Sequence, residues 1–206
     1  YDHLIIAIGN VSISSRIKGA SEHAITFGSV ADAERAALQL QRLDSLSLPE
    51  RPVVLVGASI EGLEVLGEII RRYKRQWRFQ LHVIEQSPQV MPQFPGMDSY
   101  LRERDADLDI RWHTGRKVIE VKKDSVVLDN GEVLASRITL WCGGAMPHPL
   151  LADSGLAAAG QYAPVQASLQ SLYDDHIWLA GDAVAFPAAR AGRRSPPFRR
   201  DTSPAF

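Results

Sequence analysis

Short apolar runs and helical patterns alternate along most of the chain. Four of the runs are bounded by glycine, proline or polar residues, as buried strands usually are. These runs lie at 4–8, 53–56, 79–84 and 110–113. Between the second and the third run, from about Ile60 to Lys74, apolar residues recur at helical spacing. The alternation predicts an α/β fold built on a Rossmann-like parallel sheet.

Local signals add further elements to this pattern. Ser29 followed by Asp32 is typical of a helix start, because the serine side chain caps the first free amides and the acid suits the positive end of the helix. Residues 97–104 predict a short polar helix. Residues 137–141 and 176–186 each contain another strand, and the second of these strands ends in a Gly-Asp pair.

Residues 116–135 change from helical spacing to a two-residue alternation of apolar and polar positions. This segment contains the turn sequence Asp129-Asn130-Gly131, which is a strong signal for a β-hairpin. We therefore expect an antiparallel ribbon of two or three strands, inserted as a crossover into the parallel sheet.

Composition narrows the class of protein. The chain has 206 residues and a net charge of −1, so nothing points to nucleic acid as a partner. No apolar run approaches the length of a membrane span, and no secretory signal precedes the first strand, so we expect a cytoplasmic protein. The six histidines are scattered, and we expect no metal site. With Cys142 as the single cysteine, no internal disulfide can form.

The segment RPVVLVGASIEGLEVLGEII (51–70) contains the strongest functional pattern. Glycines at the first, third and sixth positions of a strand-to-helix turn allow a tight turn, close approach of a pyrophosphate and close packing of the helix. Here these positions hold Gly57, Ser59 and Gly62. The serine is small and its hydroxyl can donate to a phosphate oxygen. An ordinary strand–loop–helix stays the alternative interpretation of this turn.

Two acids strengthen the nucleotide interpretation. Glu85 follows the strand LHVI, where an acid accepts hydrogen bonds from the ribose hydroxyls of the adenosine. An acid there also repels a 2′-phosphate, so NADH is favoured over NADPH. We place Glu64 in the first turn of the helix, where its charge suits the helix dipole and where it approaches the nicotinamide side. A solvated carboxylate at the end of a strand is the alternative for Glu85.

Three motifs in order now resemble a known family. GASIEGLEVLGEI resembles the NADH fingerprint of the two-dinucleotide flavoprotein reductases, the pyridine nucleotide-disulfide oxidoreductase superfamily. YDHLIIAIGN resembles the segment that closes the first part of their FAD domain, and HIWLAGDAVAF resembles their second FAD motif. ITLWCGGAMPHPLL and the residues after it are similar to type II NADH dehydrogenases and to the flavoprotein module fused to some selenide–water dikinases.

The resemblance implies roles for individual residues. Those matching the NADH site are Gly57, Ser59, Ile60, Gly62, Glu64, Glu85 and Gly144. Those matching the FAD site are Ala7, Gly9, Gly181 and Asp182, the last of which would hold the ribityl chain. Ile8 stands where the family has threonine, which removes a hydroxyl from that contact. Cys142 is interpreted as a buried strand thiol, with a thiol close to the flavin as the alternative.

The resemblance also implies a domain organisation, in which the polar, proline-containing segment 44–52 serves as a linker. We expect the chain to be a fragment, because the first FAD turn and the C-terminal interface domain of the family are missing. The expected segments are a partial FAD domain (1–48), an NAD(H)-binding Rossmann-like domain (49–146), a return segment to the FAD domain with the Gly-Asp motif (147–186) and a disordered basic tail (187–206). A basic arm that binds a partner is the alternative for the tail.

The function implied is the NADH-binding part of a flavin-dependent oxidoreductase, which passes hydride from NADH to FAD and then to an acceptor such as a quinone. No side chain is expected to act as a catalytic acid or base. Two alternatives stay open: a nucleotide-binding module without turnover, and a structural domain that has lost nucleotide binding. If the parent protein reduces a quinone, we expect it to lie at the inner face of a membrane. The oligomeric state stays open, and a homodimer is one of the alternatives.

Overall fold

The computed structural model describes residues 2–186, which form two compact units. The first unit contains residues 2–10 and 146–186, and the second contains Val11–Ala145. The tail at 187–206, for which the sequence predicts disorder or a basic arm, lies outside the described residues.

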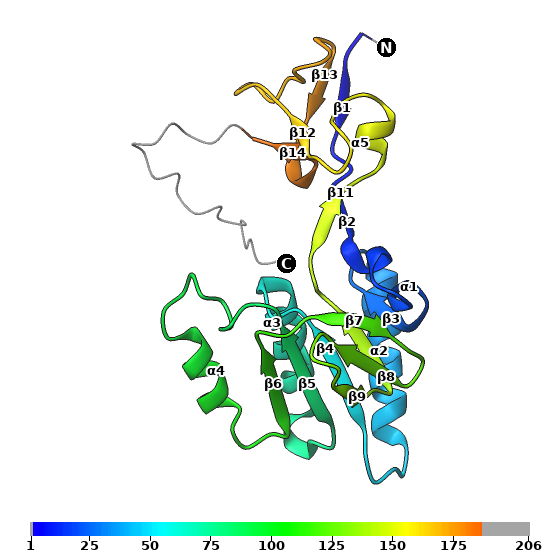
Figure 1. Cartoon of the computed structure of the whole chain (residues 1–206), viewed down its shortest axis with the longest axis vertical. Helices are drawn as coiled ribbons and strands as arrows, with labels where there is room; N and C mark the ends of the chain where they lie inside the picture. The colour runs from blue at the N-terminus through cyan, green and yellow to red at the C-terminus, as the bar shows by residue number, and fades with distance from the viewer. Residues whose placement is uncertain (1, 187–206) are drawn as a thin grey trace. The chain divides into compact units, whose positions relative to one another are not determined.

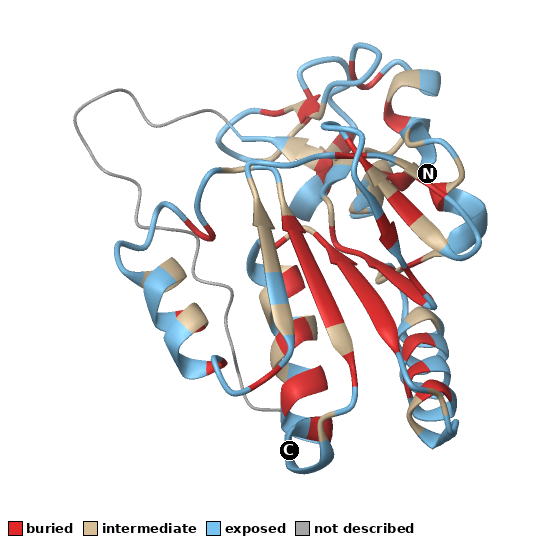
Figure 2. Ribbon diagram, turned by 60° about the horizontal axis from the view of Figure 1, so that its bottom comes forward, coloured by how far each residue is buried: buried red, intermediate tan, exposed pale blue. Residues whose placement is uncertain are grey.

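A five-stranded parallel sheet forms the centre of the second unit (Figure 1). Its order is β3-β10-β4-β5-β6, with bounds Ala24–Thr26, Ile138–Trp141, Pro52–Val56, Gln80–Glu85 and Ile110–Thr114. Every residue of β4 and of β10 is buried, as expected for central strands of a sheet that is covered on both faces (Figure 2). The predicted α/β fold with a parallel sheet is confirmed.

Three helices cover one face of this sheet. They are α2 (Val30–Ser45), α3 (Ile60–Tyr73) and α4 (Met97–Arg104). Their apolar stripes join the inward residues of β4, β5 and β10 in one hydrophobic cluster. Helix α2 begins as predicted, because the Ser29 side chain accepts a hydrogen bond from Asp32 N at 3.2 Å. No helix within residues 2–186 combines the length and the apolar character that a membrane span requires.

An antiparallel ribbon covers the opposite face. Its strands are β7 (Val118–Val121), β8 (Ser125–Leu128) and β9 (Val133–Ala135), which confirms the predicted crossover ribbon. The turn between β8 and β9 contains Gly131, whose N–H donates to Leu128 O at 3.0 Å. The short segments η1 (Ile13–Arg16) and α1 (Ala20–His23) also lie in this unit, and Ala20 and Ile13 contribute to the cluster under the ribbon.

The boundaries of the units differ from those expected. Residues 11–48 belong to the unit with the parallel sheet, although the sequence analysis assigned them to an FAD segment. The physical reason is that β3 pairs with β10, where Ile25 lies opposite Leu140, and that α2 buries Leu40 and Leu43 in the core of the sheet. Within the proline-containing segment 44–52, residues 46–51 are consequently a loop inside this unit, between the end of α2 and the start of β4.

The first unit contains shorter elements around a smaller core. They are β1 (Leu4–Ile6), part of β2 (Asn10–Ser12), part of β11 (Ala145–Pro147), α5 (Leu150–Asp153), β12 (Ala163–Pro164), β13 (Ile177–Leu179), η3 (Gly181–Ala183) and β14 (Val184–Ala185). Strand β1 pairs in parallel with β13, and β12 pairs in parallel with β14. Leu151, Leu156 and Leu179 are among the buried residues of this core.

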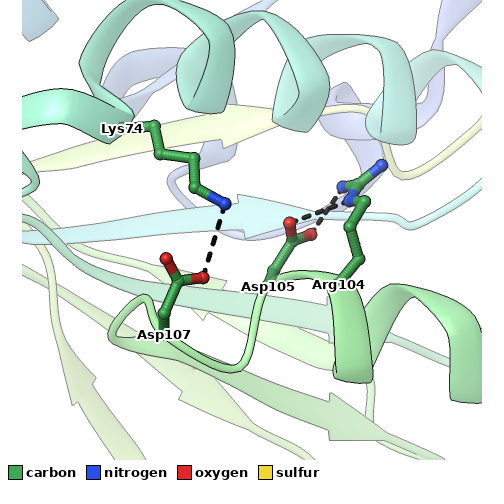
Figure 3. Close-up of polar contacts among 4 residues, drawn as sticks. All are labelled: Lys74, Arg104, Asp105 and Asp107. Atoms are coloured by element: carbon green, nitrogen blue, oxygen red, sulfur yellow. Dashed lines mark hydrogen bonds and ion pairs between the residues drawn. The ribbon is translucent and has the colours of Figure 1, made fainter.

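Ion pairs hold the segment between α4 and β6 (Figure 3). Arg104 donates from Nε to Asp105 Oδ1 at 2.8 Å, and the Asp105 carboxylate is almost fully buried. Lys74, the first residue of η2 (Lys74–Gln76), approaches Asp107 Oδ1 at 3.5 Å. The buried pair is the more significant of the two, because an exposed lysine–carboxylate pair contributes little stability.

Two histidines meet between the sheet and the ribbon. His82 on β5 and His113 on β6 share a hydrogen bond of 2.9 Å between Nδ1 and Nε2, and their rings stack. Burial lowers the pKa of both rings below the usual value, and the neighbouring charges of Arg111, Asp109 and Glu132 modify the shift. A single shared hydrogen bond needs only one N–H, so the pair is stable in its neutral form.

We expect the second unit to lose stability as the pH falls below about 6.5. The unfolded histidines bind protons near that pH, whereas the folded pair binds them only at lower pH, so the free energy of unfolding decreases by at most about 1.4 kcal/mol per pH unit for each histidine. Urea denaturation between pH 7.5 and 5 measures this slope. The variant His82→Gln should have a smaller slope and the exposed control His23→Gln an unchanged one. If the free energy of unfolding had the same pH slope in all three proteins, the pH dependence could not be assigned to the pair of His82 and His113.

Candidate functional site

The turn after β4 is closed by backbone atoms. Gly57 has a φ of +91°, and its N–H donates to Ile84 O at 2.7 Å. A Cβ at this position would lie 2.2 Å from the carbonyl oxygen of Cys142. Because that atom belongs to the backbone and cannot rotate away, only glycine fits the first position of the motif.

The sixth position of the motif is restricted for a different reason. Gly62 is buried in the first turn of α3, directly over the preceding turn. A Cβ there would lie 1.9 Å from the carbonyl oxygen of Gly57. The glycine therefore lets the helix pack against the loop, which is the role that the spacing predicted.

The start of α3 presents backbone N–H groups that precede the helical hydrogen bonds. The first helical hydrogen bond runs from Leu63 N to Ser59 O at 2.9 Å, so the amides of Ile60 and Gly62 precede the helical ladder. Ser59 is the N-cap residue, but its exposed hydroxyl makes no capping hydrogen bond. These amides and the positive end of the helix dipole form a place where an anion can bind.

Glu85 lies at the tip of β5, as predicted, and it also fastens the turn. Its Oε2 accepts a hydrogen bond from Ala58 N, and its Oε1 accepts one from Ser87 N, each at 2.8 Å. Each oxygen retains a lone pair for a further donor. The two amides fix the orientation of the carboxylate, and this contact between the acid and the glycine turn was not foreseen from the sequence.

A cavity of about 410 Å³ opens over this turn, and all its lining residues belong to the second unit. It lies at the carboxyl ends of β4, β5 and β10, where ligands bind in open parallel sheets. Four of the predicted NADH residues line it: Gly57, Ser59, Glu85 and Gly144. Its walls also include the basic residues Arg116 and Lys117 and the apolar residues Ile84, Val118 and Trp141. The basic pair follows the turn at Gly115, and that local signal could have identified it.

The other three predicted NADH residues do not line the cavity. Gly62 acts through packing, and Ile60 is half exposed at the start of the helix. The prediction that Glu64 lies in the first turn is wrong, because α3 begins at Ile60 and the acid of the first turn is Glu61. Glu64 is exposed and lies in the following turn.

Cys142 follows the last residue of β10 and is buried. Its N–H donates to Val56 O at 2.7 Å, which extends the pairing of β10 with β4. Burial, with a smaller contribution from the negative charge of Glu61, raises the pKa of the thiol far above its usual value. The thiol is therefore protonated at neutral pH, in agreement with the interpretation of a buried structural cysteine.

The predicted FAD residues come together within the first unit. Because β1 and β13 are parallel neighbours, the segment with Ala7 and Gly9 lies beside the segment with Gly181 and Asp182. Asp182 Oδ2 accepts a hydrogen bond from the side-chain amide of Asn10 at 3.2 Å. Asn10 was not among the predicted site residues, although it follows the glycine of the YDHLIIAIGN motif directly.

The chain is similar to several known proteins. The family model described as pyridine nucleotide-disulphide oxidoreductase matches residues 1–199. A probable NADH dehydrogenase of Dictyostelium discoideum is 25% identical over 177 residues, which are 75% of this chain and 39% of that protein. The demethylphylloquinone reductase NdbB of Synechocystis sp. is 21% identical over 189 residues, which are 89% of this chain and 46% of that protein.

A solved structure supports the fold independently. NDH2 of Plasmodium falciparum in complex with NADH superposes with a TM-score of 0.75 at 22% identity, over 90% of this chain and 44% of that one. At this identity the likeness concerns the fold. In each of these three comparisons, the chain spans less than half of the length of the matched protein.

Proposed function

Because the family match covers more than half of its length, the chain belongs to the pyridine nucleotide-disulphide oxidoreductase family, and we propose that it is the NADH-binding part of a flavin-dependent oxidoreductase. One observation supports the proposal most. Gly57, Ser59 and Glu85 line a single cavity at the carboxyl edge of the parallel sheet.

The cavity offers complementary groups for each part of the dinucleotide. The amides at the start of α3 and the Ser59 hydroxyl would donate to the pyrophosphate. The Glu85 carboxylate, held by two backbone amides, would accept hydrogen bonds from the hydroxyls of the adenosine ribose. Gly144 would let the dinucleotide lie against the end of β10, and the exposed Glu64 remains the candidate for the nicotinamide side.

Residues of the first unit fit a flavin dinucleotide. Asp182 is exposed, and one of its oxygens is held by Asn10, so the other oxygen is available to the hydroxyls of a ribityl chain. Gly181 precedes it, and Ala7 and Gly9 lie on the neighbouring segment. Bound FAD supplies the hydride acceptor and the route by which electrons leave. The protein's residues would position the two cofactors, without a side chain acting as acid or base.

We propose a small-molecule electron acceptor for the parent protein. The relative named demethylphylloquinone reductase makes a quinone the first candidate. A quinone acceptor would bring the parent protein to the inner face of a membrane, whereas the cytoplasm remains the expected location of this part of the chain.

Calorimetric titration tests the nucleotide site. We expect the chain to bind NADH more tightly than NADPH, because Glu85 repels the 2′-phosphate. Glu85→Arg should shift the ratio of the two affinities toward NADPH by about tenfold or more, since a charge repulsion becomes an attraction. The control Glu103→Arg, on the exposed side of α4, should leave the ratio unchanged.

Two results would contradict the proposal. If the chain bound neither NADH nor NADPH, the interpretation of a structural domain would be favoured. If Glu85→Arg left the ratio of the NADH and NADPH affinities unchanged, Glu85 would not belong to the ribose site. The absorbance of the purified chain reports its FAD content. Binding of NADH without its oxidation would identify a nucleotide-binding module that has no turnover of its own.

A further inference from the structure

The order of the strands divides the cavity over the glycine turn into subsites. Strand β5 lies between β4 and β6 (Figure 1), and neighbouring strands are about 4.8 Å apart. The turn with Gly57 follows β4, and Glu85 lies one strand away at the tip of β5. A pyrophosphate at the turn and a ribose at Glu85 leave the base on the side of β6, because base and pyrophosphate are attached to opposite sides of the ribose.

The turn between β6 and β7 forms the wall of the cavity on this side. Two backbone hydrogen bonds fix it to the tip of β5: Arg116 N donates to Glu85 O at 3.1 Å, and Gly115 N donates to Ser87 O at 2.9 Å. Ser87 is also the residue whose N–H holds one oxygen of the Glu85 carboxylate. The backbone of Arg116 is therefore fixed directly beside the ribose acceptor, and its side chain lines the cavity.

The guanidinium group of Arg116 is available to a ligand. Within residues 2–186 it forms no ion pair, and its printed contact is a long hydrogen bond from Nη1 to Gly115 O at 3.4 Å. The neighbouring Glu85 does not bind it, because both oxygens of that carboxylate accept hydrogen bonds from backbone amides. The side chain is exposed, so an unneutralised planar cation faces the place of the base.

An adenine base offers a flat face on which a planar group can stack. Among the described residues that line the cavity, Trp141 is the only aromatic one, and it ends β10, two strands away from β5. A guanidinium group is planar and stacks on aromatic faces, where the ring also attracts its charge. Lys117, the next cation of the wall, has no planar surface. Arg116 therefore combines the position and the shape that an adenine base requires.

We propose that Arg116 is a specificity-determining residue, which selects an adenine dinucleotide by stacking its guanidinium group on the face of the base. The inference rests on the proposed nucleotide-binding function and assigns a role to a residue outside the glycine motif. Glu85 then binds the ribose and Arg116 the adenine, so that two residues joined by a backbone hydrogen bond recognise the two halves of the adenosine.

Calorimetry with the full chain tests the proposal with NADH, NADPH, ADP-ribose and reduced nicotinamide mononucleotide, the last of which lacks the adenosine. Arg116→Ala should weaken binding of NADH and of ADP-ribose about tenfold each. It should leave the affinity for the mononucleotide and the ratio of the NADH and NADPH affinities unchanged. Arg116→Lys should still bind NADH at least about threefold more weakly than the wild type, because an ammonium group cannot stack.

The matched control is Lys123→Ala, which removes one exposed positive charge between β7 and β8, outside the cavity, and should bind all four ligands like the wild type. The melting temperature of Arg116→Ala should equal that of the wild type, because the side chain is exposed.

Three results would overturn the role of Arg116 alone: unchanged NADH affinity in Arg116→Ala, equal weakening of the mononucleotide, or a loss confined to NADPH, which would assign the guanidinium group to the 2′-phosphate. If the wild-type chain did not bind NADH, the proposed nucleotide site would fall together with this role.

Discussion

Replacing Gly62 with alanine is expected to destabilise the chain by about 3 kcal/mol or more and to abolish NADH binding. The new Cβ would lie 1.9 Å from the carbonyl oxygen of Gly57 and 2.9 Å from its carbonyl carbon. Both atoms belong to Gly57, whose N–H donates a hydrogen bond to the carbonyl oxygen of Ile84 and so holds the turn in place. Helix α3 would therefore have to move away from β4. Urea denaturation measures the first effect and calorimetry with NADH the second.

Gly67 is the matched control for this variant. It lies in the same helix, and a Cβ there would meet nothing within 4 Å. Gly67→Ala should therefore increase the free energy of unfolding by about 0.5–1 kcal/mol, because alanine is the better helix former, and it should leave NADH binding unchanged. If both alanine variants behaved alike, the close contact between α3 and the turn would not exist in solution.

Replacing Glu85 with glutamine should have the second largest effect. One oxygen of the carboxylate accepts a hydrogen bond from Ala58 N, and the other oxygen accepts one from Ser87 N. Glutamine has a single acceptor oxygen, and its NH₂ group would face the second N–H. We expect a loss of about 1–3 kcal/mol of stability, since one partly buried amide loses its partner. NADH affinity should fall at least about tenfold, because the ribose acceptor is lost and the turn is released.

Denaturation and calorimetry of Glu85→Gln are compared with Glu103→Gln, which removes the same charge from an exposed position on α4. The control excludes a general effect of net charge. Unchanged stability in Glu85→Gln would mean that the two backbone amides find other partners, and the description of Glu85 as a clamp of the turn would then be wrong.

The sequence predicted the parts of the site that depend on local geometry. The spacing of Gly57 and Gly62 predicted a tight turn and a closely packed helix, because both requirements arise within a few residues of chain. The position of Glu85 followed from the length of the preceding strand. The crossover ribbon followed from its two-residue period and its Asp-Asn-Gly turn.

The remaining features depend on contacts between distant segments. Neither the pairing of β3 with β10 nor the inclusion of residues 11–48 in the sheet unit has a local signal. The same is true of the hydrogen bond between Ala58 and Glu85, and of His82 beside His113. Composition could mark 44–52 as a loop, but it could not show on which side of a domain boundary the loop lies.

The contacts around Gly57 and Gly62 restrict how this turn can change over time. Each missing side chain is excluded by a main-chain atom, whose position does not depend on the identity of the neighbouring residue. No second substitution can therefore compensate for the first. In descendants that retain this architecture, both positions should stay glycine whichever coenzyme is used.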